Sequence, residues 1–386
     1  MNKPLRPARV PDALFAACGY FMPRLMFLQS RHAPQVHWGD IAQALQDFPC
    51  QNLDLASSAF WDEWMRRWVR VGDRYVQIAT DSSTAAGQSR ALRSAAACYH
   101  WAEFMYFDDA AYKTALRQQV RDCFRQSLAG SDLWLNAGEV TVDGVPVPYY
   151  LIWPERHFAE SADVPCMILS NGLDSMTECE VLAIAEQYLE RGIATLLFDG
   201  PGQGIHVGRH PLNIRMESVV CALVKQLRKQ PRIDSSRLGF LGVSFGGYLA
   251  LRVAQQIGQH FRCVVNLSGG PRVAPFAGLP RRLKEDFRFA FMGGDDADMQ
   301  SRFDALELDE FVPCQTEVLS VHGALDDIFP IDDLMDLASS WGPRHQLVIH
   351  ETEAHVCLNL INQHSITTAD WVAERLLCEQ PMGVPQ

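Results

Sequence analysis

Residues 238–246 read LGFLGVSFG, which places Ser244 between two glycines at the end of an apolar run. The run is typical of a buried strand, and residues 248–257 have the composition of a helix. Glycines on both sides of the turn let the chain pass sharply from strand to helix, which lifts the serine hydroxyl out of the backbone. The stretch therefore predicts Ser244 as a nucleophile, while a glycine-rich turn with a purely structural role has the same form.

Two chemically complementary residues follow Ser244 at the ends of later apolar runs. Asp326 closes the segment GALD at residues 323–326, and His355 comes after the last apolar run. A serine hydroxyl needs an adjacent base, and the base needs a third group that fixes its tautomer. Serine, acid and histidine in this chain order are typical of the α/β-hydrolase fold. We therefore predict His355 as the base and Asp326 as the acid that orients it.

Both of these positions have competitors nearby in the chain. His322 and His350 stand at the ends of predicted strands, where packing or a local hydrogen bond is the simpler role. Asp327 follows Asp326 directly, and only one of the two carboxylates can point at the imidazole. Asp327 is better placed to face solvent or to cap the next helix, so we prefer Asp326.

Acyl transfer also needs two backbone N–H groups that stabilise the oxyanion. One is predicted at Phe245, directly after the nucleophile, and the other in the turn SNGLDS at residues 170–175. Gly172 lets substrate approach this turn closely, so the amide of Leu173 is the predicted second donor. Residues 175–178, which read SMTE, predict a capping box for the helix that follows.

A second glycine-rich segment, DGPGQG at residues 199–204, invites comparison with nucleotide-binding loops. Val207 stands where the third glycine of the dinucleotide pattern belongs, and the Lys-Ser/Thr pair of a phosphate-binding loop is absent. We therefore predict a structural loop beside the active site.

The pattern of the chain changes near residue 135. Residues 1–135 show helical patterning and are predicted to form a helical N-terminal cap or accessory region. Three tryptophans at helical spacing, Trp61, Trp64 and Trp68, fit either the core of this region or an aromatic wall that faces substrate.

Residues 136–386 are predicted to form an α/β catalytic domain. A hairpin with an Asp-Gly turn at residues 143–144 is followed by alternating strand-like and helical runs, which predict a mostly parallel sheet with helices on both faces. The segment around 270–312 is too long for a simple connection, so we predict a lid insertion there. The parallel strands are predicted at Cys166–Leu169, Ala194–Phe198, Leu238–Leu241, Cys263–Leu267, Val318–Val321 and Gln346–His350.

The charge and the cysteine distribution argue against several classes of ligand. A net charge of -12, with no long run of lysine or arginine, argues against a nucleic-acid ligand. The 11 cysteines are scattered singly with no C-x-x-C pair, so they fit neither a zinc site nor a disulfide framework. We therefore expect reduced thiols and a cytoplasmic protein, with no exported leader and no membrane span.

With these residues assembled, the chain resembles one group of α/β-hydrolases, the 2,6-dihydroxypseudooxynicotine hydrolases and fungal yellowish-green pigment hydrolases. The resemblance covers about residues 90–377. The residues that carry it are 171–175 with Glu178, 198–204, Ser244 in its turn, and His355 followed by Cys357 and Asn359.

The resemblance implies a function as well as a fold. Members of this group cleave carbon-carbon bonds next to a ketone, carry a helical cap over the active site and use serine, aspartate and histidine. These roles carry over to Ser244, Asp326 and His355, and the group implies a homodimer formed through cap elements. Nothing in residues 271–299 matches the group, so no substrate-binding residue is predicted.

Together, these observations predict a serine hydrolase that acts on a small carbonyl compound through an acyl-enzyme. The expected bond is a C–C bond of a β-diketone, an acyl-phenol or a polyketide-like substrate, because the departing carbon must delocalise charge. Neither a metal nor an organic cofactor is expected. The alternatives are a carboxylesterase, thioesterase or acyltransferase with the same triad, and a non-catalytic binding protein on a hydrolase fold.

Overall fold

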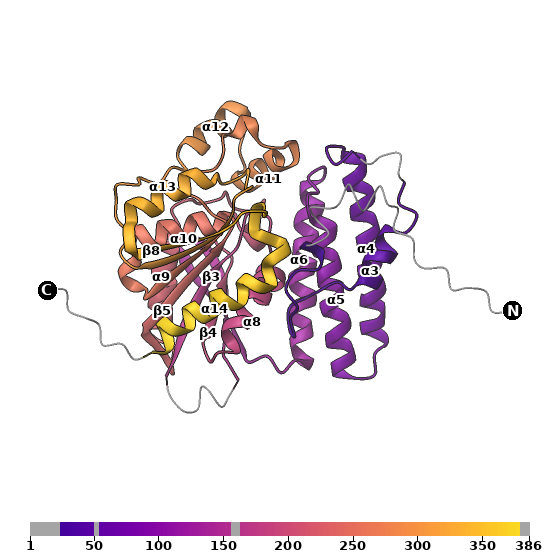
Figure 1. Cartoon of the computed structure of the whole chain (residues 1–386). Coiled ribbons are helices and arrows are strands. Elements are labelled where there is room, and N and C mark those ends of the chain that lie inside the picture. Colours follow the sequence, from indigo (N-terminus) through magenta and orange to yellow (C-terminus); the bar gives the residue numbers. More distant parts are fainter. Residues whose placement is uncertain (1–23, 50–53, 156–162, 379–386) are drawn as a thin grey trace. The chain divides into compact units, whose positions relative to one another are not determined.

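The computed structural model (Figure 1) describes residues 24–49, 54–155 and 163–378. The chain divides into two compact units, Met1–Asp132 and Leu133–Gln386. The first unit is helical in its described part, and the second holds the sheet.

Three long α-helices and one short one make up most of the described part of the first unit. Polar residues begin the long helices: Ser57, Thr84 and Asp109 each accept a hydrogen bond from a backbone N–H of the first turn, which satisfies donors that a helix leaves open. The helices are α3 (Trp38–Leu45), α4 (Ser58–Asp81), α5 (Ala85–Glu103) and α6 (Ala110–Ser127).

The tryptophans at helical spacing lie in the core of this unit. Trp61, Trp64 and Trp68 are each at most 1% exposed. The indole nitrogen of Trp64 donates a hydrogen bond of 2.7 Å to the carbonyl of Trp101 on α5, and the Trp61 ring packs edge-on against Phe104. Of the two interpretations open from the sequence, core packing is therefore correct.

One eight-stranded sheet forms the second unit, in the order β1-β2-β4-β3-β5-β6-β7-β8. β1 pairs antiparallel with β2, and β2 pairs antiparallel with β4. From β4 to β8 in that order, each strand pairs in parallel with the next. The strands are β1 (Leu135–Val142), β2 (Val145–Ile152), β3 (Val164–Ser170), β4 (Ala194–Phe198), β5 (Ile233–Val243), β6 (Cys263–Leu267), β7 (Glu317–Gly323) and β8 (His345–His350).

Helices cover both faces of this sheet (Figure 1). α8 (Leu182–Leu189) and α14 (Ile361–Leu377) pack together on one face, while α9 (Glu217–Leu227) and α10 (Phe245–Gln256) pack together on the other. Every residue of β3, β4 and β6 is buried, as expected for strands covered on both sides. Three further α-helices of this unit are α11 (Arg281–Phe291), α12 (Asp296–Asp304) and α13 (Ile331–Trp341). The mostly parallel sheet with helices on both faces is thus confirmed.

The segment after β6 contains α11 and α12. Phe287 and Phe291 of α11 pack edge-on against Phe245 at the start of α10, and Phe303 of α12 packs against Phe287. Residues 270–312 therefore rest on the helix that follows Ser244.

The start of the helix after β3 differs from the prediction. The backbone enters it through a π-helical turn, Thr177–Val181, whose N-cap residue is Met176. The buried carboxylate of Glu178 accepts a hydrogen bond of 2.9 Å from the Tyr150 hydroxyl on β2. Because the N-cap is Met176 rather than Ser175, the capping box predicted at residues 175–178 is wrong.

Candidate active site

Ser244 lies at the turn between β5 and α10 with φ 57° and ψ −119°, a conformation that non-glycine residues rarely adopt. The flanking residues must be glycines because any side chain there would collide with neighbouring backbone. A Cβ at Gly242 would stand 1.8 Å from the Gly246 carbonyl oxygen, and one at Gly246 would stand 2.4 Å from that of Asn171. The turn is therefore closed by backbone-to-backbone packing that only glycine permits.

His355 reaches this turn from the loop after β8. Its Nε2 lies 2.8 Å from Ser244 Oγ, although 111 positions separate the two residues. Val356 and Cys357 both have positive φ, and the Glu353 carboxylate accepts hydrogen bonds from the backbone and side-chain amides of Asn359. The hydrogen bonds between Glu353 and Asn359 thus close the loop that carries His355.

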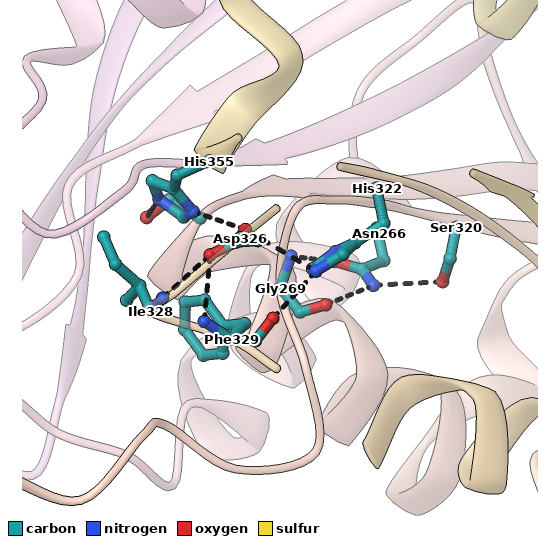
Figure 2. A network of polar contacts seen from close by, with 9 residues as sticks. Asn266, Gly269, Ser320, His322, Asp326, Ile328, Phe329 and His355 are labelled. Atoms are coloured by element: carbon teal, nitrogen blue, oxygen red, sulfur yellow. Dashed lines mark hydrogen bonds and ion pairs between the residues drawn. The ribbon is translucent and has the colours of Figure 1, made fainter. Parts of the chain in front are cut away.

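Asp326 contacts the other nitrogen of the imidazole (Figure 2). Asp326 Oδ2 lies 2.8 Å from His355 Nδ1, while Oδ1 accepts the backbone N–H groups of Ile328 and Phe329. Burial alone raises the pKa of the Asp326 carboxyl, but the charge and hydrogen bond of His355 outweigh it and hold the pKa below its ordinary value. An ionised carboxylate only accepts, so Nδ1 of a neutral His355 carries the proton and Nε2 is free to accept the serine proton.

The structure separates these residues from their competitors. Asp327 is exposed, and the N-cap residue of α13 is Pro330, so Asp327 faces solvent and does not cap the helix. The His350 ring packs against His364 with a centroid distance of 6.1 Å. His322 is fully buried and contacts the carbonyl of Phe329 beside Asp326. Ser244, Asp326 and His355 are the predicted side chains that the fold brings together.

Each of the two predicted oxyanion donors is next in the chain to a residue of the nucleophile turn or beside it: Phe245 follows Ser244, and Leu173 follows Gly172. The amide of Phe245 is the first of α10, where helical N–H groups lack a partner inside the helix. β3 and β5 are neighbours with Ser170 opposite Gly242, so the turn after β3 ends beside Ser244. A Cβ at Gly172 would lie 3.9 Å from Ser244 Oγ. The predicted donor, the Leu173 amide, is joined directly to this glycine.

Asn266 is a supporting residue that sequence reasoning missed. Its side chain donates to Ser320 Oγ (3.0 Å) and to the Gly269 carbonyl, and accepts from the Gly269 N–H (Figure 2). A Cβ at Gly269 would meet the backbone of Gly247 on α10 at 2.3 Å, so this network holds the turn after β6 against the nucleophile helix. The available signal was a single polar residue inside the apolar run CVVNL.

Further properties of the described residues concern metal binding, the reactivity of a thiol and membrane-spanning helices. Within residues 24–49, 54–155 and 163–378, no cluster of three histidine, cysteine or carboxylate side chains could hold a metal ion. Burial raises the pKa of the Cys357 thiol to about 12, so this neighbour of His355 stays protonated. The described cysteines are free thiols. In the same part of the chain, none of the helices has the length and apolar character to span a membrane.

The chain is similar to proteins that are named as hydrolases. The chain is 27% identical over 328 residues to a protein named 2,6-dihydropseudooxynicotine hydrolase from Paenarthrobacter nicotinovorans, a match that covers 81% of this chain and 85% of that protein. It is 28% identical over 210 residues to the hydrolyase poxO of Penicillium oxalicum, covering 50% of this chain and 49% of that protein. The chain therefore spans about half the length of this fungal relative.

A solved structure shows the same fold. The crystal structure of 2,6-dihydroxy-pseudo-oxynicotine hydrolase superimposes with a TM-score of 0.73 at 24% identity, over 89% of this chain and 93% of that one. The α/β-hydrolase fold and the resemblance predicted from the sequence are thus confirmed.

Family models identify the chain more directly. The prolyl oligopeptidase family model matches residues 215–376. The model described as esterase FrsA-like matches residues 56–277, more than half of the chain. The chain is an α/β-hydrolase and belongs to the FrsA-like esterase family.

Proposed function

We propose that this α/β-hydrolase cleaves a bond next to a carbonyl group through an acyl-enzyme on Ser244. The observation that carries the proposal is the continuous chain of two 2.8 Å contacts from Ser244 Oγ through His355 to Asp326. A nucleophile and base within hydrogen-bond reach, with the base oriented by a third group, is the arrangement that activates a serine.

The proposed reaction has two halves. Ser244 Oγ attacks the carbonyl carbon as its proton passes to His355 Nε2, and the amides of Phe245 and Leu173 hold the oxyanion. Collapse of the intermediate breaks the scissile bond, and the leaving group takes the proton from His355. Water, deprotonated by the same imidazole, then hydrolyses the acyl-enzyme and restores Ser244. Asp326 stabilises the imidazolium throughout.

We propose a C–C bond as the scissile bond, in a β-diketone, an acyl-phenol or a polyketide-like small molecule. The departing carbon leaves as a carbanion equivalent, so the substrate must delocalise that charge until the proton arrives. The support is the resemblance to the 2,6-dihydroxypseudooxynicotine and pigment hydrolase group, with the relatives named above. The same residues serve an esterase, thioesterase or acyltransferase, because leaving-group chemistry lies mainly in the substrate.

Paired substrates distinguish these functions. We expect the purified chain to hydrolyse both an aryl ester and a β-diketone, with Ser244→Ala abolishing both activities and covalent labelling by a fluorophosphonate. Fast ester turnover with no C–C cleavage would defeat the preferred substrate class. Absence of labelling and of turnover would favour a non-catalytic binding protein.

Neighbouring carboxylates provide a matched pair of variants. Asp326→Asn removes the group at His355 Nδ1, and we expect kcat to fall by about 10⁴-fold, as for other triads. Asp327→Asn changes the exposed neighbour and should leave kcat unchanged. Equal effects of the two substitutions would contradict the assigned role of Asp326.

We propose further that residues 1–135 act as a cap, that residues 270–312 act as a lid and that the chain forms a homodimer. The dimer and cap rest on the group resemblance alone. Light scattering on the purified full-length chain tests the oligomeric state: a monomeric mass across the working concentration range would exclude the dimer.

A further inference from the structure

We infer that the glycine-rich loop at residues 199–204 positions the peptide between Asn171 and Gly172 and thereby directs the Leu173 amide, one of the two proposed oxyanion donors, toward the oxyanion beside Ser244. Asp199 and Gln203 act through Asn171, the residue that begins the turn after β3. The inference rests on the proposed function, because it assigns these two side chains a part in oxyanion stabilisation. They are positioning residues rather than groups that contact the reacting atoms.

Asp199 holds the side chain of Asn171. Its Oδ1 accepts hydrogen bonds from Asn171 Nδ2 (2.6 Å) and Thr177 Oγ1 (2.5 Å), and its Oδ2 accepts from the backbone N–H of Ile205. Asp199 is 3% exposed and Asn171 is fully buried. A carboxylate only accepts, so the nitrogen of the Asn171 amide, and not its oxygen, must face Asp199. The orientation of this side chain is therefore determined.

Gln203 holds the backbone of the same residue. Its Nε2 donates a hydrogen bond of 2.5 Å to the Asn171 carbonyl oxygen, and both residues are fully buried. In a trans peptide the C=O and the following N–H point in opposite directions. The bond from Gln203 therefore fixes the direction of this carbonyl and with it the direction in which the chain continues through Gly172 to Leu173.

The nucleophile turn confines that carbonyl from another side. A Cβ at Gly246 would stand 2.4 Å from the Asn171 carbonyl oxygen, and a Cβ at Gly172 would stand 3.5 Å from Ser244 Cβ. Asn171 is thus held at its side chain by Asp199, at its carbonyl by Gln203 and against the backbone at Gly246. A rotated peptide at this position would redirect the chain at Gly172 and with it the Leu173 amide.

The glycines of the loop explain how it reaches Asn171. Gly204 has φ +51°, and a Cβ there would lie 1.9 Å from Asp199 Oδ1. Gly202 has φ +75°, and a Cβ there would lie 2.2 Å from the Cα of Leu212. The loop closes tightly around the Asp199 carboxylate, which brings the Ile205 N–H to it and the Gln203 amide to the turn.

Gln203→Met tests the inference with a side chain of similar length that cannot donate. Loss of one oxyanion donor lowers kcat by about 10²–10³-fold in a serine protease, and a donor that is still present but misdirected should cost less. We expect kcat on an aryl ester to fall by about 10- to 100-fold with little change in KM. The inhibition constant of a phenylethyl trifluoromethyl ketone should rise by the same factor, because its hemiketal oxyanion uses the same donors.

Two further variants complete the experiment. Asp199→Asn replaces a group that only accepts hydrogen bonds. It should lower kcat and raise the inhibition constant by one common factor. Thr316→Val is the control, since it removes a buried hydrogen bond of 2.8 Å to the Phe261 carbonyl, just before β7. We expect this control to lower the melting temperature while leaving kcat and the inhibition constant unchanged. If Asp199→Asn fails to fold, Gln203→Met decides the question.

The outcomes separate this inference from the proposed function. Wild-type turnover that is lost in Ser244→Ala, with parallel changes in kcat and ketone affinity for Gln203→Met, supports both. Wild-type values of kcat and ketone affinity in Gln203→Met overturn the positioning role and leave the proposed function standing. A lowered melting temperature with unchanged ketone affinity also overturns it, because the role is then only structural. A wild-type chain with neither turnover nor fluorophosphonate labelling defeats both.

Discussion

His322 Nε2 lies 2.8 Å from the carbonyl oxygen of Phe329 and 3.5 Å from the Asp326 carboxylate (Figure 2). A carbonyl only accepts, so Nε2 carries the proton and donates to Phe329. Burial lowers the pKa of His322, although the Asp326 charge partly opposes this. A neutral imidazole therefore supports the turn 326–329 from within the sheet and leaves Asp326 free to interact with His355.

Removing this support should affect both stability and catalysis. We expect His322→Leu to lower the free energy of unfolding by about 1–3 kcal/mol, because the Phe329 carbonyl loses its buried donor. The turn that carries Asp326 loosens as well, so kcat should fall by about tenfold. His322→Gln can still donate and should recover part of both losses. Unchanged kcat in His322→Leu, measured beside its unfolding curve, would show that the histidine only fills space.

Glycine at position 246 should be irreplaceable, unlike an exposed glycine elsewhere. In Gly246→Ala the added methyl group meets the Asn171 carbonyl, so we expect a loss of about 1–3 kcal/mol in unfolding free energy and a large fall in kcat. Gly278→Ala is the control, because a Cβ there meets nothing within 4 Å. It should stay within about 0.5 kcal/mol of wild type. Urea unfolding and ester kinetics on both variants decide the matter.

A buried ionic cluster in the first unit predicts a pH-dependent stability. The fully buried carboxylate of Glu103 on α5 contacts Lys113 and Arg117 of α6, and His100 Nδ1 lies 3.2 Å from it. Burial raises the pKa of Glu103, but the charges of Arg117 and Lys113 outweigh it and hold the pKa well below the ordinary value. A depressed carboxyl pKa stabilises the fold above the unfolded-state pKa, and this contribution is lost as the pH falls through the folded-state value.

Glu103→Gln should therefore destabilise the chain most at neutral pH. We expect a loss of about 3–5 kcal/mol at pH 7, since two buried cations lose their counterion. The difference from wild type should shrink as the pH falls below about 4, where the unfolded chain takes up the proton. Glu63→Gln is the matched control, because its pair with Arg67 is partly exposed and should contribute at most about 1 kcal/mol. A pH-independent difference for Glu103→Gln would contradict this account.

His345 predicts a second pH effect, in the sheet. Ser320 Oγ lies 2.7 Å from His345 Nε2 and accepts a hydrogen bond from Asn266. Burial lowers the pKa of His345 to about 4. The unfolded chain binds a proton here near pH 6.5 and the folded chain does not, so stability falls as the pH drops from about 6.5 to 4.

His345→Gln keeps a hydrogen-bonding group that can reach Ser320 but cannot titrate. We expect its unfolding free energy at pH 7 to remain within about 1.5 kcal/mol of wild type and to fall less steeply between about pH 6.5 and 4.5. Part of the slope should remain, because burial also lowers the pKa of His364 to about 4. Parallel wild-type and variant curves in urea titrations across this range would exclude His345 as a source of the slope.

A strand was predicted only in part where polar residues interrupt its run of apolar residues. β5 begins at Ile233, five residues before the predicted start, because its first half contains Asp234, Ser236 and Arg237. This half pairs with β3 only through Ile233 and Val164, so it has little apolar periodicity to detect. No residue of β1 at the sheet edge is fully buried, so its apolar pattern is also weak.

Sequence by itself determined the order of the elements and the positions that carry chemistry. Apolar runs, turn glycines and the succession of Ser244, Asp326 and His355 are local signals, and each can be recognised within a few residues. The sequence also favoured Asp326 over Asp327, but two adjacent carboxylates in one turn differ little in any local pattern.

Only the tertiary structure decided which of these groups meet. The path of the turn after β7 directs Asp326 to the imidazole, with two backbone amides on its Oδ1, and leaves Asp327 exposed. The same holds for the contacts of His322, Asn266 and Asp199, whose partners lie on other strands and turns. A short stretch of sequence fixes which groups are present, whereas distances between residues far apart along the chain are set by strand pairing and close packing.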